Sequence, residues 1–262
     1  MNITRLGMLC IFSMSVLAHA ADTRDTACRT TAECQAEADQ LRGVSAKDAT
    51  SARTKARDQF YWLGRINMAT TVMTVEEGVV PRKLARQIAE GVAHSIAQAE
   101  QPGGKRPTDV LQIERIITDK AGPEATLIHA GRSRQDMLAS VRAMRLRDEM
   151  LDTAAALLAT RQDLLEIASR NVETFIPAYT NGVQAQPITY AHYLLAFADS
   201  FARDSQRIRD LYPRLNLSPM GTSVLANSAW PLNRNRLADL LGFDRLVTNS
   251  YDAGQIITYD VP

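Results

Sequence analysis

The chain lacks an excess of charge of either sign. It contains 30 lysine and arginine residues against 29 acidic residues. Residues 1–20 hold one of the basic residues, Arg5, and no acidic one, so the remainder carries 30 − 1 = 29 basic against 29 acidic side chains. Proteins that bind nucleic acid or anionic membranes concentrate basic charge on one face. The balance predicts neither kind of partner.

The sequence also lacks an apolar run long enough to cross a membrane. The most apolar stretch, Met8–Leu17, falls short of the about 20 residues that a spanning helix needs. It follows Arg5 and precedes Ala18-His19-Ala20, a small-x-small pattern typical of signal-peptide cleavage. We therefore predict a signal peptide over residues 1–20, a mature chain from Ala21 with no membrane segment, and a periplasmic or secreted location. An uncleaved anchor is the alternative.

Cysteine is scarce, and the pairing of the two cysteines after the signal peptide is left open. An exported chain meets an oxidising compartment, which favours a disulfide between Cys28 and Cys34. On one continuous helix their Cα atoms would lie about 9 Å apart, from the rise per residue. A disulfide spans at most about 7 Å. Pairing would therefore require a turn between the two residues.

Common motifs for cofactors, metals and nucleophiles are absent as well. The sequence has no glycine-rich phosphate loop, no G-x-S-x-G and no CxxC. The three histidines after residue 20, His94, His129 and His192, show no metal spacing with a second ligand. We expect no cofactor and no metal.

A helical period runs through most of the chain, and no long stretch alternates with a period of two. Asp109 is placed to cap a helix over Val110–Lys120, which Gly122 ends. Pro81 suits the first turn of a helix that follows the break at Gly78. The apolar stripe predicted before that break is Met68, Val72, Val75 and Val79, and the stripe predicted after it is Leu84, Ile88, Val92 and Ile96.

The second part of the chain predicts long helices. One runs from near Arg134 to near Asn171 and carries an apolar residue every seven positions. A second follows Pro187 and ends at Pro213, and a third covers Arg234–Leu241 and stops at Gly242. The first seam is Met137, Met144, Leu151, Leu158 and Leu165; the second helix shares a face made of Leu194, Phe197, Phe201, Ile208 and Leu211.

These patterns predict an all-α fold. A small N-terminal helical domain would occupy residues 21–130, and the first part of a long-helix bundle would occupy residues 131–262. The methionines and leucines of the seams are interpreted as core residues.

Three segments carry the polar motifs. Gly131–Asp136 reads G-R-S-R-Q-D, immediately before the first long helix. Ile176–Pro187 reads I-P-A-Y-T-N-G-V-Q-A-Q-P, and Pro219–Asn227 reads P-M-G-T-S-V-L-A-N. By itself, the first motif is a polar helix cap, although a hydroxyl, a guanidinium and an amide at a helix N-terminus also suit a carboxylate.

In this order, the three motifs resemble the argininosuccinate lyase branch of the fumarase/aspartase superfamily, whose patterns are G-R-S-R-N-D, P-G-Y-T-H-x-Q-x-A-Q-P and P-L-G-S-G-A-L-A-G. The resemblance implies an enzyme that breaks a C–N or C–O bond and releases fumarate from a succinyl-amine or related dicarboxylate substrate. It also implies a homotetramer in which three subunits build each active site.

Carried over by position, the resemblance implies that Ser133, Arg134 and Gln135 bind the substrate carboxylates, with Thr180 and Gln186 as further substrate-binding residues. The catalytic candidates are Thr180 and Asn181. Asn181 stands where the family has a histidine, and its amide can donate a hydrogen bond but cannot relay a proton. Gln135 replaces a family asparagine, and Ser223 and Asn227 replace family glycines, which reduces the freedom of the backbone.

The resemblance covers about Phe60–Ala253, and the sequence contains no S-S-x-M-P-Q-K-x-N-P loop, whose serine is taken as the base in the family. The expectation is a bundle truncated before the family's C-terminal half. Three hypotheses follow: a lyase polypeptide that could be inactive alone, a non-catalytic exported helical protein that binds a small carboxylate or acts in assembly, or an unstable fragment whose seam of methionines and leucines is left partly uncovered.

Overall fold

The computed structural model describes residues 57–257, which divide between two compact units that are described separately. The first, here called the α4 unit, comprises residues 57–148 and 213–257; the second, the hairpin unit, comprises residues 149–212. The predicted signal peptide and Cys28 and Cys34 lie outside the described residues, and the predicted domain boundary after residue 130 stays a prediction.

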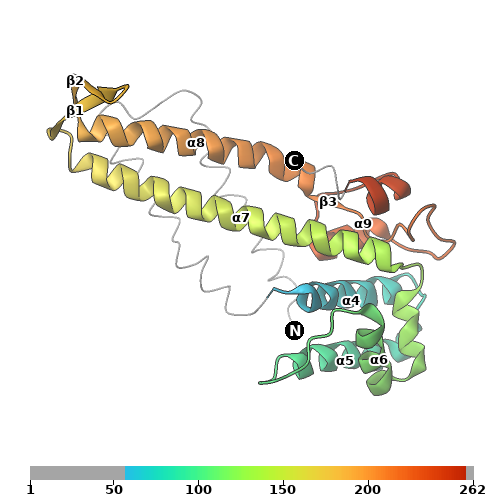
Figure 1. Ribbon diagram of the computed structural model, residues 1–262. Helices are drawn as coiled ribbons and strands as arrows, with labels where there is room; N and C mark the ends of the chain where they lie inside the picture. The colour runs from blue at the N-terminus through green and yellow to red at the C-terminus, as the bar shows by residue number, and fades with distance from the viewer. Residues whose placement is uncertain (1–56, 258–262) are drawn as a thin grey trace. The chain divides into compact units, whose positions relative to one another are not determined.

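The α4 unit begins with three helices and a 3-10 segment (Figure 1). Asp58 caps the first helix by accepting a hydrogen bond from Tyr61 N at 2.9 Å. Asp109 caps the third by accepting from the N–H groups of Leu111 and Gln112, as predicted. Their bounds are α4 Gln59–Glu76, α5 Arg82–Ala99, α6 Val110–Ala121 and η1 Pro123–His129.

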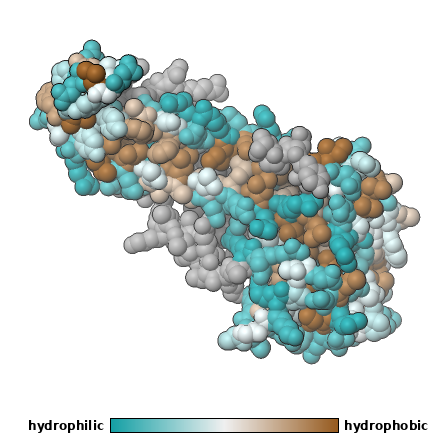
Figure 2. Space-filling view, viewed as in Figure 1, coloured by the Kyte–Doolittle hydropathy of each residue, from teal (hydrophilic) through white to brown (hydrophobic). Residues whose placement is uncertain are grey.

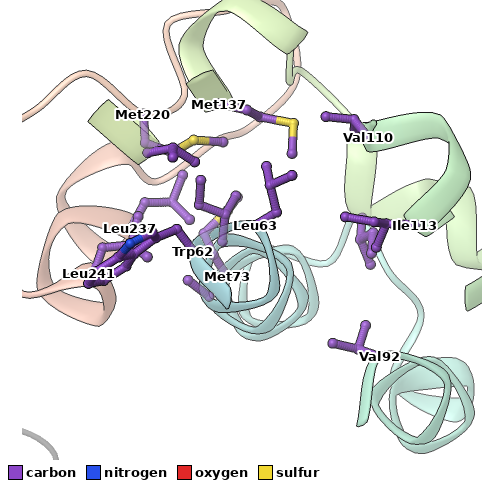
Figure 3. Packing of buried hydrophobic residues seen from close by; sticks show 14 of the residues in the cluster. Trp62, Leu63, Met73, Val92, Val110, Ile113, Met137, Met220, Leu237 and Leu241 are labelled. Atoms are coloured by element: carbon purple, nitrogen blue, oxygen red, sulfur yellow. The ribbon is translucent and has the colours of Figure 1, made fainter. Parts of the chain in front are cut away.

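Helix α4 lies at the centre of this unit, and its predicted apolar stripe was wrong. Met68 is 37% exposed, whereas Leu63, Ile66 and Met73 are buried. The helix contacts α5, η1 and α9, so it is buried on several sides and no single stripe marks its core face. Figure 3 shows Trp62, Leu63 and Met73 of α4 together with Val92, Val110, Ile113, Met137, Met220, Leu237 and Leu241 from the surrounding elements.

The rest of the α4 unit comes from two segments far apart in sequence. Arg147, on α7, donates hydrogen bonds to Leu241 O at 2.9 Å and to Gly242 O. These carbonyl groups lie at the C-terminal end of helix α9, where the helix dipole favours a cation. Gly242 ends α9 in the left-handed conformation (φ 72°), as predicted. The elements are the first part of α7 Arg134–Ser169, β3 Leu217–Ser218, α9 Arg234–Leu241, β4 Arg245–Leu246 and the π-helical turn Asp252–Ile256.

The hairpin unit contains two strands that the sequence prediction missed. Strands β1 Phe175–Thr180 and β2 Val183–Thr189 pair antiparallel, with Thr180 opposite Val183. Asn181 and Gly182 form the two-residue loop, with φ 49° and 77°. Two positive φ values match a type I′ turn, for which Asn-Gly is a favoured sequence. The strands are short, so the all-α class is unchanged.

In this unit the second part of α7 packs against α8 Tyr190–Leu215 through small and branched side chains (Figure 1). Leu165, Ala168 and Ala198 are buried. Two predictions about α8 were wrong. Phe197 is 45% exposed and packs edge-on against Tyr193. The helix also continues past Pro213 to Leu215, although proline has no N–H group to donate to the carbonyl four residues before it.

The surface of the hairpin unit mixes apolar and hydrophilic side chains along α7 and α8 (Figure 2). None of the helices within residues 57–257 combines the length and the apolar character needed to cross a membrane.

Candidate functional site

Helix α7 begins at a capping box formed by Ser133 and Asp136. Ser133 Oγ accepts a hydrogen bond from Asp136 N at 3.2 Å, and Asp136 Oδ1 accepts one from Ser133 N at 2.9 Å. This reciprocal pair satisfies the N–H group of Asp136, inside the first turn, and the N–H group of Ser133, just before it. The remaining N–H groups of that turn have no intrahelical acceptor and point out of the helix end, where an anion is favoured.

The other oxygen of Asp136 ties this helix end to the loop Pro219–Asn227. Asp136 Oδ2 accepts hydrogen bonds from Gly221 N at 3.1 Å and from Ser223 N at 3.2 Å. The side chain is fully buried. Burial raises the pKa of Asp136, against the opposing effect of the hydrogen bonds from Ser133 and Ser223. Two of the three predicted motifs are therefore joined through one carboxylate.

The loop Pro219–Asn227 keeps the left-handed backbone that the family glycines would allow. Ser223 and Asn227, which replace those glycines, have φ values of 51° and 65°. Val224 has φ 74°, an unfavourable conformation for a β-branched residue. Strain of this kind persists where surrounding contacts impose it. The hydrogen bonds to Asp136 are such contacts, and Asn227 N also donates to Thr222 O at 3.1 Å.

Arg132, immediately before the capping box, is anchored to α4. Its Nη1 donates to Asn67 Oδ1 at 3.1 Å and to Thr70 Oγ1 at 2.6 Å. Its Nη2 lies 2.7 Å from His129 Nδ1. Burial lowers the pKa of Arg132 to about 10, so the guanidinium stays charged near neutral pH. Arg132 thus fixes the turn that presents Ser133.

His129 is neutral in this environment. Burial, with the neighbouring charge of Arg132, lowers the pKa of His129 to about 3. A neutral imidazole has one acceptor nitrogen. Arg132 Nη2 lies 2.7 Å from Nδ1 and 2.9 Å from Nε2, and Nε2 also lies 3.8 Å from the carboxylate of Glu114. These contacts give His129 a structural role beside Arg132.

Arg134 and Gln135 occupy the first turn of α7, and the side chain of Gln135 is held by the protein more firmly than that of Arg134. The side chain of Arg134 is 58% exposed, and its Nη2 lies 3.6 Å from Asp109 Oδ2 at the start of α6. Gln135 Nε2 donates to Gly254 O at 3.1 Å, in the π-helical turn. Arg134 can reach a bound anion, whereas one amide hydrogen of Gln135 is already used inside the protein.

The remaining predicted site residues lie on the hairpin unit. Thr180 ends β1, Asn181 is the first loop residue and Gln186 lies on β2 opposite Ala178. All three predicted residues are exposed. They share one hairpin, while Ser133, Arg134 and Gln135 share the start of α7 in the α4 unit.

Sequence reasoning missed the residues that hold this helix end in place. Asp136 was predicted only as part of a motif, and not as the residue whose hydrogen bonds hold that motif together, although the spacing S-x-x-D is a signal for a capping box. Asn67 and Thr70 gave no signal, because their contact with Arg132 depends on tertiary packing. Among residues 57–257, no group of histidine, cysteine and acidic side chains is arranged to hold a metal.

The fold and the joined motifs match a known class of proteins. The chain belongs to the lyase family: the family model described as "Lyase" matches residues 21–256. Its relatives include argininosuccinate lyases. Argininosuccinate lyase of Heliobacterium mobile is 38% identical over 194 residues, which cover 72% of this chain and 42% of that protein.

Two further proteins are similar to this chain over a similar share of its length. Argininosuccinate lyase of Acetivibrio thermocellus is 34% identical over 183 residues, covering 70% of this chain and 39% of that protein. A solved structure described as an EDDS lyase variant with bound fumarate is 36% identical, with a TM-score of 0.70, and the match covers 75% of this chain and 39% of that one. The chain therefore spans less than half the length of these relatives.

Proposed function

We propose that this chain provides part of the active site of a lyase of the argininosuccinate lyase type, which eliminates fumarate from a succinyl-amine or related substrate. One observation carries the proposal. The capped start of α7 holds Ser133 and Arg134 beside the loop Pro219–Asn227, which Asp136 joins to it. Family membership supports the reaction class.

In this proposal the α4 unit binds a substrate carboxylate. Arg134 supplies a charge-assisted hydrogen bond, and the first-turn N–H groups of α7 add backbone donors. Ser133 already donates its hydroxyl hydrogen to Asp136 Oδ1 at 3.1 Å, so it contributes mainly by fixing the turn. Such fixed donors would stabilise the doubly negative carboxylate that forms when the adjacent carbon loses its proton.

The hairpin residues have the second role. Thr180 would donate a hydrogen bond to substrate, Gln186 would contribute its amide, and Asn181 would donate without relaying a proton. We propose a homo-oligomer, a tetramer by family resemblance, in which hairpins and α7 helix ends from different subunits meet. Export to the periplasm or beyond is likewise proposed; the family match begins at residue 21, after the proposed signal peptide.

The alternative is an exported binding protein without catalysis. The observation that favours it is Asn181, which occupies a type I′ turn and cannot replace the proton relay of a histidine. Such a protein would bind a small carboxylate at the same helix end.

Fumarate release, followed by ultraviolet absorbance, distinguishes the two functions. The purified chain, alone and mixed with a polypeptide that carries the family's serine loop, is incubated with argininosuccinate and other succinyl-amines, and succinate binding is measured by calorimetry in parallel. The lyase proposal expects fumarate to accumulate, and faster in Asn181→His. Saturable succinate binding without turnover in the mixture, by the chain or by this variant, would favour the binding protein. In either case, Arg134→Gln should weaken binding about tenfold, the loss of one charge-assisted hydrogen bond, whereas Arg86→Gln should not.

A further inference from the structure

A groove with a volume of about 580 Å³ lies between α6 and the loop before it. This volume falls within the about 300–1,000 Å³ of ligand pockets. Its lining combines charged and apolar side chains, and none of them belongs to the predicted site residues. The lining residues are Lys105, Arg106, Pro107, Leu111, Gln112, Arg115, Ile116 and Asp119.

The charge of the groove is positive, and two of its cations are available. Arg106 is held by Asp58, to which it donates at 2.6 and 2.8 Å, so it forms a fixed wall. Lys105 and Arg115 are exposed and form no ion pair with another described residue. Asp119 is the acidic lining residue and offsets one of these charges.

The groove adjoins the proposed carboxylate site. Asp109, whose carboxylate lies 3.6 Å from Arg134, caps α6 through the N–H groups of Leu111 and Gln112. Those two residues line the groove, and Pro107 lines it two residues before Asp109. A ligand whose carboxylate is bound by Arg134 would therefore extend past Asp109 toward Lys105 and Arg115.

We propose, on the basis of the proposed function, that this groove receives the leaving-amine end of the substrate and selects amines that carry a carboxylate. The two available cations match an anionic end group, and the side chains of Leu111 and Ile116 match an aliphatic connection to it. A leaving group with a guanidinium or ammonium end would meet like charge here. The geometry thus points to an acidic amine as the product released beside fumarate.

Three 2-alkylsuccinates test the proposal by calorimetry, because they share the succinyl end and cannot release an amine. Their side chains have equal length and end in a carboxylate, a carboxamide or an ammonium group. The carboxylate-ended probe should bind about fivefold more tightly than the carboxamide, as two exposed ion pairs allow. The ammonium-ended probe should bind most weakly.

Variants connect this preference to the groove. In Lys105→Gln/Arg115→Gln the carboxylate-ended probe should fall to the affinity of the carboxamide, whose own affinity is unchanged. Asp119→Asn should widen the preference. Lys120→Gln, an exposed lysine of α6 outside the lining, is the matched control and should leave all three affinities as they are.

The outcomes separate the two proposals. Equal binding of the three probes, or a preference that survives in the double variant, overturns the acidic-amine inference and leaves the carboxylate site intact. If no probe binds, or if Arg134→Gln weakens none of them, the proposed function fails and the inference fails with it.

Discussion

The two groups of predicted site residues differ in how the protein holds them. At the start of α7, Ser133 and Asp136 form a capping box, Asp136 binds the loop Pro219–Asn227, and Arg132 reaches α4. On the hairpin, Thr180 and Asn181 are exposed, and a two-residue turn sets their geometry. The first group depends on tertiary contacts, and the second on local backbone preference.

This difference separates two reasons for a family-like motif. G-R-S-R-Q-D serves the architecture as much as the ligand, because Arg132, Ser133 and Asp136 direct their polar atoms into the protein. In Tyr179–Val183 the polar groups remain exposed, and the turn requires only residues that can adopt a positive φ. Substitutions should therefore affect stability strongly at the first site and weakly at the second.

The largest expected effect comes from Asp136→Asn. The carboxylate accepts four hydrogen bonds, two on each oxygen, from Ser133, Gly221 and Ser223. An amide NH₂ group would face N–H donors and leave them buried without an acceptor, so the free energy of unfolding should fall by about 3 kcal/mol. Urea unfolding followed by circular dichroism measures this loss. The exposed Asp163→Asn should change it little, and equal midpoints for the two variants would contradict the role of Asp136.

A smaller effect, per pH unit, is expected from His129 in acid. Its pKa in the folded protein is about 3, below the ordinary 6.5, so between these pH values the unfolded chain binds a proton that the folded chain does not. The stability that His129 contributes is fully present above pH 6.5 and is lost as the pH falls toward 3, at up to about 1.4 kcal/mol per pH unit.

Urea unfolding at a series of pH values isolates this contribution. His129→Asn should show a flatter decline between pH 6.5 and 3 than the original chain, whatever its stability at neutral pH. The exposed His94→Asn serves as the control and should keep the original slope. A slope that is the same in His129→Asn and in the original chain would show that the histidine is not kept neutral by burial.

The comparison also explains what could be predicted from the sequence. Helix ends set by local chemistry, such as Asp109 at the start of α6 and Gly242 after α9, were found because their signals lie within a few residues. The helical class followed from periodicity. The buried face of α4 was misassigned because it is packed on several sides, so that the period of its apolar residues carries little information.

Within the candidate site, residue types were easier to predict than their partners. The family motif identified Ser133, Arg134 and Gln135, but not that Gln135 is bonded to Gly254, 119 positions away. That contact depends on tertiary packing and leaves no local pattern. The hairpin was missed for another reason: Asn181-Gly182 is a strong local signal for a type I′ turn, but each flanking strand contains a proline, Pro177 or Pro187, which argues against a strand.

The smallest expected effect lies at the hairpin turn. Gly182 has φ 77°, and a Cβ added there would meet no atom within 4 Å. Gly182→Ala should therefore cost only the backbone penalty of a left-handed alanine, about 1 kcal/mol. Hydrogen exchange should show faster opening of the amides in β1 and β2, with those at the start of α7 unchanged. Gly182→Asn is the matched control and should cost less, because asparagine accepts this conformation more readily. If both variants also speed exchange at Asp136, the hairpin and the α7 helix end do not unfold independently.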